Sequence, residues 1–101
     1  MAGLGQADAA HLDVNRVIQE LESVTDHANG ESFDVKRERP GSNITGYVVR
    51  RDFRGLNSAD RQRNLRTFFV ERFGPETTEI GLVLTFTPEE FDDWLEDARS
   101  I

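Results

Sequence analysis

A strand that runs directly into a strongly marked helix start is the feature that most constrains this chain. Apolar residues alternate along positions 80–86, the period of a strand that buries one face. We expect the buried face to carry Ile80, Leu82, Leu84 and Phe86. Thr87-Pro88-Glu89-Glu90 follows and supplies an N-cap, a proline at the first helical position and the glutamate of a capping box. In the helix that begins there, a buried stripe is expected at Phe91, Trp94, Leu95 and Ala98.

Two more helices and two more strands are predicted upstream. Helical spacing of apolar residues predicts a helix over residues 12–28 with Asp13 as its N-cap, and another that opens near Asn57 and closes at Gly74. Residues 33–39 and 44–53 are predicted to pair as a hairpin around the turn at 40–43. The expected fold is α+β: a single αββαβα domain in which helices pack on a three-stranded mixed sheet.

Length and composition favour one small domain. The 101 residues fit a single core. Residues 1–11 are small and polar and are expected to be mobile, which leaves 12–101 for the domain. The chain has no cysteine, no secretory signal pattern and no apolar run of about 20 residues that could cross a bilayer. We therefore expect a cytoplasmic protein without a membrane partner.

Charge is distributed unevenly along the chain. The net charge is −7, but residues 36–72 hold ten basic and four acidic residues, a local balance of +6. Two interpretations remain open. The acidic ends either neutralise the basic middle within the fold, or the basic middle is a surface for a partner.

Neither catalysis nor a resident cofactor is predicted. His11 and His27 lie at opposite ends of the first predicted helix, without metal-ligand spacing. The acidic residues of the last helix are typical of a solvated helix face. No glycine-rich phosphate loop follows a strand. The chain is thus expected not to be an enzyme, with no catalytic residue, metal site or cofactor.

An arginine-rich surface is the best candidate for binding. On a helical wheel, Arg63, Arg66 and Val70 project away from the apolar stripe of the second predicted helix, so this side can contact a partner. Arg61 falls at the edge of that stripe, where it can pair with an acid. Arg54 lies just before the helix. The predicted partner-binding set is Arg54, Arg61, Arg63, Arg66 and Val70.

Two motifs resemble those of the BolA family. Phe53-Arg54-Gly55, five residues and Arg61-Gln62-Arg63 resemble that family's Phe-x-Gly, five residues, Arg-His-Arg. The strand at 80–86 and the Thr-Pro turn after it resemble the family's last strand and its end. The likeness covers most of residues 12–94 and implies an αββαβ fold similar to a type II KH domain.

The resemblance implies a non-enzymatic regulator. BolA-like proteins are iron–sulfur trafficking partners of monothiol glutaredoxins, and some bind DNA. The family's cluster-ligating histidine precedes the last strand, where this chain has Thr78-Glu79. The loop at 40–43, which would supply the second ligand, holds neither histidine nor cysteine. We therefore predict a protein-interaction domain without cluster ligation, whose partner is unknown or glutaredoxin-like. The alternative is a KH-like nucleic-acid-binding module that uses the arginines and binds weakly.

Overall fold

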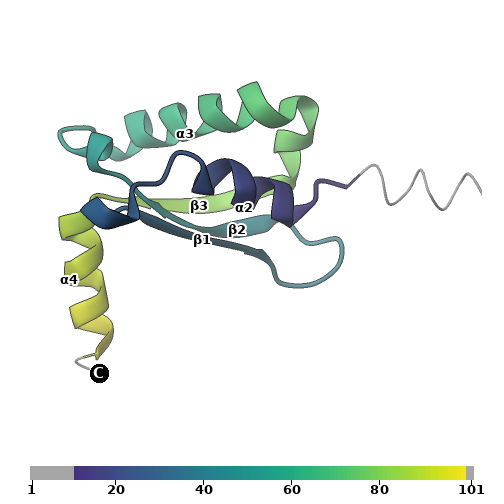
Figure 1. Cartoon of the computed structure of the whole chain (residues 1–101). Helices are drawn as coiled ribbons and strands as arrows, with labels where there is room; N and C mark the ends of the chain where they lie inside the picture. Colours follow the sequence, from purple (N-terminus) through teal and green to yellow (C-terminus); the bar gives the residue numbers. More distant parts are fainter. Residues whose placement is uncertain (1–10, 100–101) are drawn as a thin grey trace, which may run out of the picture.

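The computed structural model describes residues 11–99, so ten of the eleven residues expected to be mobile lie outside the described part. The predicted α+β class and the element order αββαβα are confirmed (Figure 1). Three short 3₁₀ helices, η1 to η3, join the main elements. The elements are α2 (Val14–Glu22), η1 (His27–Asn29), β1 (Ser32–Arg37), β2 (Ile44–Val49), η2 (Arg51–Phe53), α3 (Ser58–Phe73), η3 (Gly74–Glu79), β3 (Ile80–Phe86) and α4 (Pro88–Arg99).

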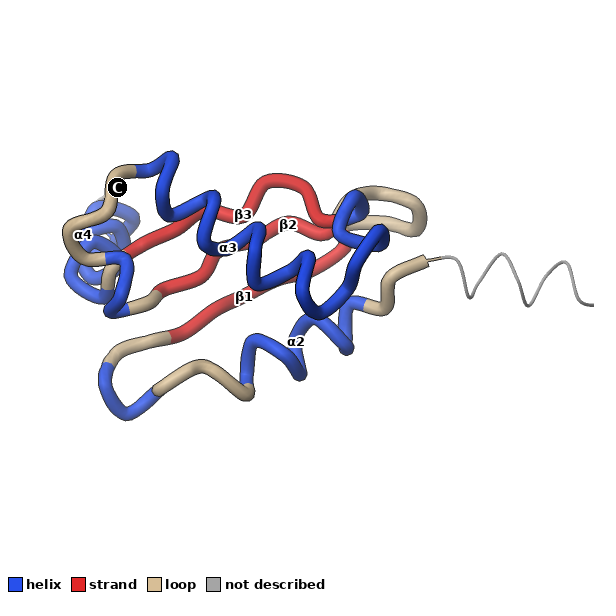
Figure 2. The backbone as a smooth tube through the Cα atoms, turned by 90° about the horizontal axis from the view of Figure 1, so that it is seen from above, coloured by secondary structure: helices blue, strands red, loops and turns tan. Residues whose placement is uncertain are grey.

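The sheet is three-stranded and mixed, in the order β1-β2-β3. β1 and β2 form an antiparallel hairpin, whereas β3 runs parallel to β2. A parallel neighbour needs a crossover connection, and α3 provides it. Figure 1 shows α2 and α3 on the same side of the sheet, and the view from above in Figure 2 shows α2 alongside β1.

The core lies between this side of the sheet and the two helices that cover it. α2 contributes Val17 and Leu21, and α3 contributes Leu65, Phe69 and Phe73, all of them buried. Val35, Ile44, Val48 and Val83 face them from the strands. α2 begins at the predicted N-cap, where the Asp13 carboxylate accepts a hydrogen bond from the Asn15 N–H. It ends earlier than predicted because the chain turns at residues 23–26 before forming η1.

The predicted orientation of β3 is wrong. Val83 is only 2% exposed, whereas Leu82 is 67% and Leu84 is 44% exposed. The register explains the reversal: Ile44 pairs with Ile80, but Gly46 pairs with Val83, so β3 carries one extra residue. Such a bulge changes which residues of a strand face the core. Ile80 and Val83 pack against the core, and Leu82 and Leu84 do not.

The start of α4 is as predicted, but its predicted buried stripe is only half-buried at Phe91 and Leu95 and is exposed at Trp94 and Ala98. The Thr87 hydroxyl accepts from the Glu90 N–H at 3.2 Å, and the Glu90 carboxylate accepts from the Thr87 N–H at 2.9 Å, which completes the capping box. α4 then projects from the sheet on the side opposite α3, and Figure 2 shows it end-on (Figure 1). Trp94 is 45% exposed and Ala98 is exposed, because no other element of residues 11–99 covers them.

Candidate interaction surfaces

The outer surface of α3 carries three of the five predicted binding residues. Arg63, Arg66 and Val70 are all exposed, as the helical wheel predicts. Arg63 pairs with Asp60 one turn earlier, at 2.7 Å. Arg66 forms no ion pair with any described residue. Arg63 and Arg66 also line a groove of about 380 Å³ between α3 and β3.

Arg54 and Arg61 are held at the junction with α4 instead. The Arg54 guanidinium donates to both oxygens of Glu89, at 2.9 and 2.5 Å. The Arg61 guanidinium donates to both oxygens of Glu90, at 2.6 and 3.2 Å, and also to the Leu56 carbonyl. These hydrogen bonds lower the pKa of both carboxyls. The predicted pairing of Arg61 with an acid is confirmed, and the structure separates these two arginines from the α3 surface.

Other arginines of the basic middle are also paired with acids. Each of the pairs Arg37–Glu79, Arg50–Asp52, Arg51–Asp26 and Arg72–Glu20 lies at 3.0 to 3.2 Å. Much of the positive charge of residues 36–72 is therefore neutralised by ion pairs within the chain. This agrees with the first of the two interpretations, in which acidic residues neutralise the basic middle within the fold.

Glu79, which the resemblance to the BolA family places near that family's ligand position, has a structural role. Its carboxylate accepts from the Leu12 N–H at 2.9 Å and from the Arg37 guanidinium at 3.0 Å, which ties the start of α2 to β1. Burial alone would raise the pKa of Glu79, but these hydrogen bonds lower it below its usual value. Gln62, at the place of the family's central histidine, donates to the Val83 carbonyl at 2.8 Å and so caps an open group of the edge strand. Among residues 11–99, no group of three or more His, Cys, Asp or Glu could hold a metal ion.

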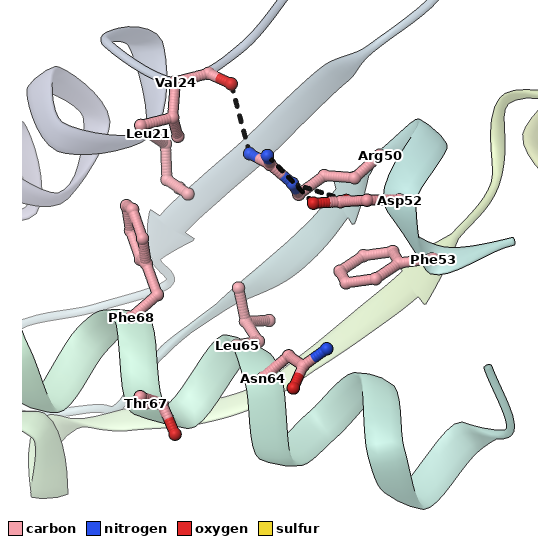
Figure 3. Close-up of a pocket in the computed structure, with 9 residues that line it drawn as sticks. All are labelled: Leu21, Val24, Arg50, Asp52, Phe53, Asn64, Leu65, Thr67 and Phe68. Atoms are coloured by element: carbon pink, nitrogen blue, oxygen red, sulfur yellow. Dashed lines mark hydrogen bonds and ion pairs between the residues drawn. The ribbon is translucent and has the colours of Figure 1, made fainter.

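A pocket of about 320 Å³ lies between α2 and α3 (Figure 3). Leu21, Leu65 and Phe68 give it an apolar lining. The Arg50 guanidinium points toward Asp52 and the Val24 carbonyl and donates to both. The remaining polar side chains that line it are Asn64 and Thr67, so the one carboxylate of the lining is held by Arg50, and no histidine, cysteine or lysine lies beside it to act as a general base or nucleophile.

Among the described residues, α4 is the only helix on the side of the sheet opposite α2 and α3, a feature the sequence analysis missed (Figure 1). We call it the open sheet face, and it carries Asp34, Tyr47, Leu82, Leu84 and Phe86. Asp34 pairs with Tyr47 and Tyr47 with Leu84, so these three form one row across the sheet. Leu82 and Leu84 are large apolar side chains left in water.

α4 stands at one end of the open sheet face and forms an aromatic cluster with it. The Tyr47 ring centroid lies 4.9 Å from that of Phe91 and 6.3 Å from those of Phe86 and Trp94. Trp94 also stacks on Phe91 at 5.7 Å. Burial and the nearby Asp34 carboxylate raise the pKa of the Tyr47 phenol. The open sheet face and the apolar side of α4 thus meet at this aromatic cluster, with α4 projecting from the sheet (Figure 1), and we call the two surfaces together the corner.

Comparison of the chain with protein-family models, with curated proteins and with solved structures finds no match. Within the described part of the chain, no helix is long and apolar enough to cross a membrane.

Proposed function

We propose that this chain is a non-enzymatic protein-interaction domain with a BolA-like fold and a regulatory role, and that it binds its partner through the corner. One observation carries the proposal: Leu82, Leu84 and Trp94 are large and exposed, and they belong to the open sheet face and to the side of α4 that packs against it. Exposed apolar side chains that share one side of a small domain are typical of a binding site, because covering them is favourable by about 25 cal/mol per Å².

The arrangement of elements supports the BolA-like part of the proposal. The first five main elements follow the order αββαβ that the resemblance implies, and α4 is a further helix after them. Glu79 is occupied by Leu12 and Arg37, which favours a role without cluster ligation. A glutaredoxin-like protein remains one proposed partner, and it would be bound through protein contacts alone.

The α3 surface is the second proposed binding surface. Its favourable observation is Arg66, which is exposed and makes no ion pair with a described residue, next to the exposed Val70. The same arginines would serve the alternative function, weak nucleic-acid binding. The acidic residues that neutralise neighbouring arginines reduce the attraction for a polyanion, so we place nucleic-acid binding second.

Two variants separate these surfaces in a capture experiment. Leu82→Asp with Leu84→Asp alters the corner, and Arg63→Ala with Arg66→Ala and Val70→Asp alters the α3 surface. Every changed side chain is exposed, so both variants should fold. Partners captured from cells of the source organism, quantified by mass spectrometry, should be lost with the first variant and retained with the second.

Opposite outcomes are equally informative. Loss of the captured partners with the α3 variant alone would mean that the chain binds them through the α3 surface. Retention of every partner by both folded variants would refute the proposal. Tight binding of short DNA or RNA, with log affinity falling against log salt at a slope of about −3 to −4, would favour the nucleic-acid function.

A further inference from the structure

We propose that the occupant of the corner is a basic amphipathic helix. This inference rests on the proposed function and adds the chemistry of the partner. It follows from the shape of the corner, from the apolar side chains it leaves uncovered and from the charges at its rim.

The shape of the corner suits a helix. The row Asp34, Tyr47 and Leu84 spans three strands, about 10 Å at the usual strand spacing. α4 has 12 residues and is therefore about 18 Å long. A helix with side chains is about 10–12 Å wide, so one helix can rest on the sheet and lie against α4 at the same time.

The apolar side chains of the corner match one stripe of such a helix. Leu82 and Leu84 project from the sheet, and Trp94 projects from α4. A partner with apolar residues at i, i+3, i+4 and i+7 presents a stripe that can contact both surfaces at once. An extended segment would instead pair with an edge of the sheet, at β1 or β3, and would not cover the side chains that project from the sheet face.

Charge at the rim selects a basic partner. α4 carries six acidic residues and one arginine, and two of the six, Glu89 and Glu90, are already paired with arginines outside the helix. At 100° per residue, Asp92 and Asp97 flank its apolar stripe on the two sides, and Asp34 lies beside Tyr47 on the sheet. None of these three carboxylates pairs with a basic group in the described residues. Complementary charge steers association and suppresses wrong partners, so lysine or arginine should border the stripe of the partner helix.

The same charges disfavour a second copy of this chain as the occupant. Two corners that face each other would bring two acidic α4 helices together, and like charges repel. The corner is also preformed, since the Arg54–Glu89 and Arg61–Glu90 pairs and the capping box hold the direction of α4. A preformed site spends little binding free energy on its own ordering.

Trp94 is the only tryptophan of the chain, and its fluorescence reports occupancy directly. The probe is a synthetic peptide of leucine and lysine, about four helical turns long and without aromatic residues, with leucine at i, i+3, i+4 and i+7. Titration of the full chain with this peptide should shift Trp94 emission to shorter wavelength, because the indole leaves water. A peptide with glutamate in place of lysine and a scrambled leucine–lysine peptide serve as controls and should cause no shift.

Matched variants locate the binding. Leu82→Asp and Leu84→Asp, each made alone, should weaken binding at least tenfold. Val70→Asp places the same charge on the α3 surface, at a residue as exposed as Leu84, and should change affinity less than twofold. Asp92→Asn with Asp97→Asn should weaken binding and flatten its salt dependence. Circular dichroism of each variant checks that it is folded. Leu82→Asp should disturb the fold least, because Leu82 is the most exposed of these residues.

Three results would overturn the inference. One is no emission shift with the lysine peptide while the wild type is folded. Another is that the glutamate or scrambled peptide binds as tightly as the lysine peptide, or that Val70→Asp weakens binding as much as Leu82→Asp and Leu84→Asp do. The third is an emission shift that grows with protein concentration alone, together with a dimer in sedimentation, which would make a second copy the occupant. If captured partners depend on Leu82 and Leu84 but the lysine peptide does not bind, the proposed function stands and only the basic helix is wrong.

Discussion

The side of β3 that faces the core can be tested with two neighbouring residues. Val83 is 2% exposed and packs among α3 and the other strands, whereas Leu82 is 67% exposed. The alternating pattern alone assigns these roles the other way round. One of the two variants, Val83→Ala or Leu82→Ala, should therefore lose stability and the other should not. With the bulge, Val83→Ala is the destabilised variant; with simple alternation, it would be Leu82→Ala.

The expected magnitudes follow from burial. Val83→Ala removes two buried methyl groups, worth roughly 1.6 kcal/mol of transfer free energy at about 0.8 kcal/mol each. The space left behind adds a cavity term, so the total loss should be about 2–3 kcal/mol. Leu82→Ala removes atoms that already contact water and should change stability by no more than about 0.5 kcal/mol.

Urea unfolding of both variants and the wild type, followed by circular dichroism at low protein concentration, measures these differences. Low concentration matters because any self-association through Leu82 would add to the apparent stability. Val83→Ala should lower the urea midpoint clearly, and Leu82→Ala should leave it almost unchanged. A loss of 2 kcal/mol or more at Leu82, or of less than about 0.5 kcal/mol at Val83, would refute the bulged register and restore the simple alternation.

Three further predictions concern the same framework. Thr87→Ala should lower the free energy of unfolding by about 1 kcal/mol in the same assay, because the Glu90 N–H loses its acceptor, and an unchanged midpoint would deny the cap any role. Gly46→Ala should prevent normal β1–β2 pairing, since its Cβ would lie 1.8 Å from the Asp34 carbonyl oxygen; a folded variant with a native spectrum would contradict this. Burial raises the pKa of Glu31, but the N–H groups of Arg51 and Asp26 and nearby guanidinium groups lower it below its usual value of 4.5. The free energy of unfolding should therefore fall as the pH drops below 4.5, and it should fall less steeply in Glu31→Gln. Equal slopes in the wild type and in Glu31→Gln would mean that Glu31 is not the responsible group.

The parts of the fold that were predictable are those with local signals. The bounds of β3 and the start of α4 follow from alternation and from the sequence Thr87-Pro88-Glu89-Glu90, and both are confirmed. The exposure of Arg63, Arg66 and Val70 follows from helical spacing alone. In each case the physical cause involves residues within a few positions of one another.

The side of β3 that is buried depends on a partner strand far away in sequence. An extra residue between Ile80 and Val83 is visible only when the register with Ile44 and Gly46 is known. Gly46 itself was a signal, because an isolated glycine within a strand often marks a bulge or a close backbone approach. The ion pair between Arg54 and Glu89 spans 35 positions, and no spacing rule identifies such a pair among nineteen acidic residues.

The direction of α4 connects these unpredicted features to binding. If α4 lay flat on the open sheet face, it would cover Leu82 and Leu84, and burying each leucine would be worth about 1.5–3 kcal/mol. Instead, its first turn is held by Arg54 and Arg61, and only the aromatic end of the sheet face is covered. The chain thus leaves apolar area in water and holds an acidic helix beside it. A partner that covers this area and carries positive charge gains both the free energy of burying the apolar side chains and the attraction to the acidic α4. For this reason the corner, rather than the α3 surface, is the stronger candidate for the contact.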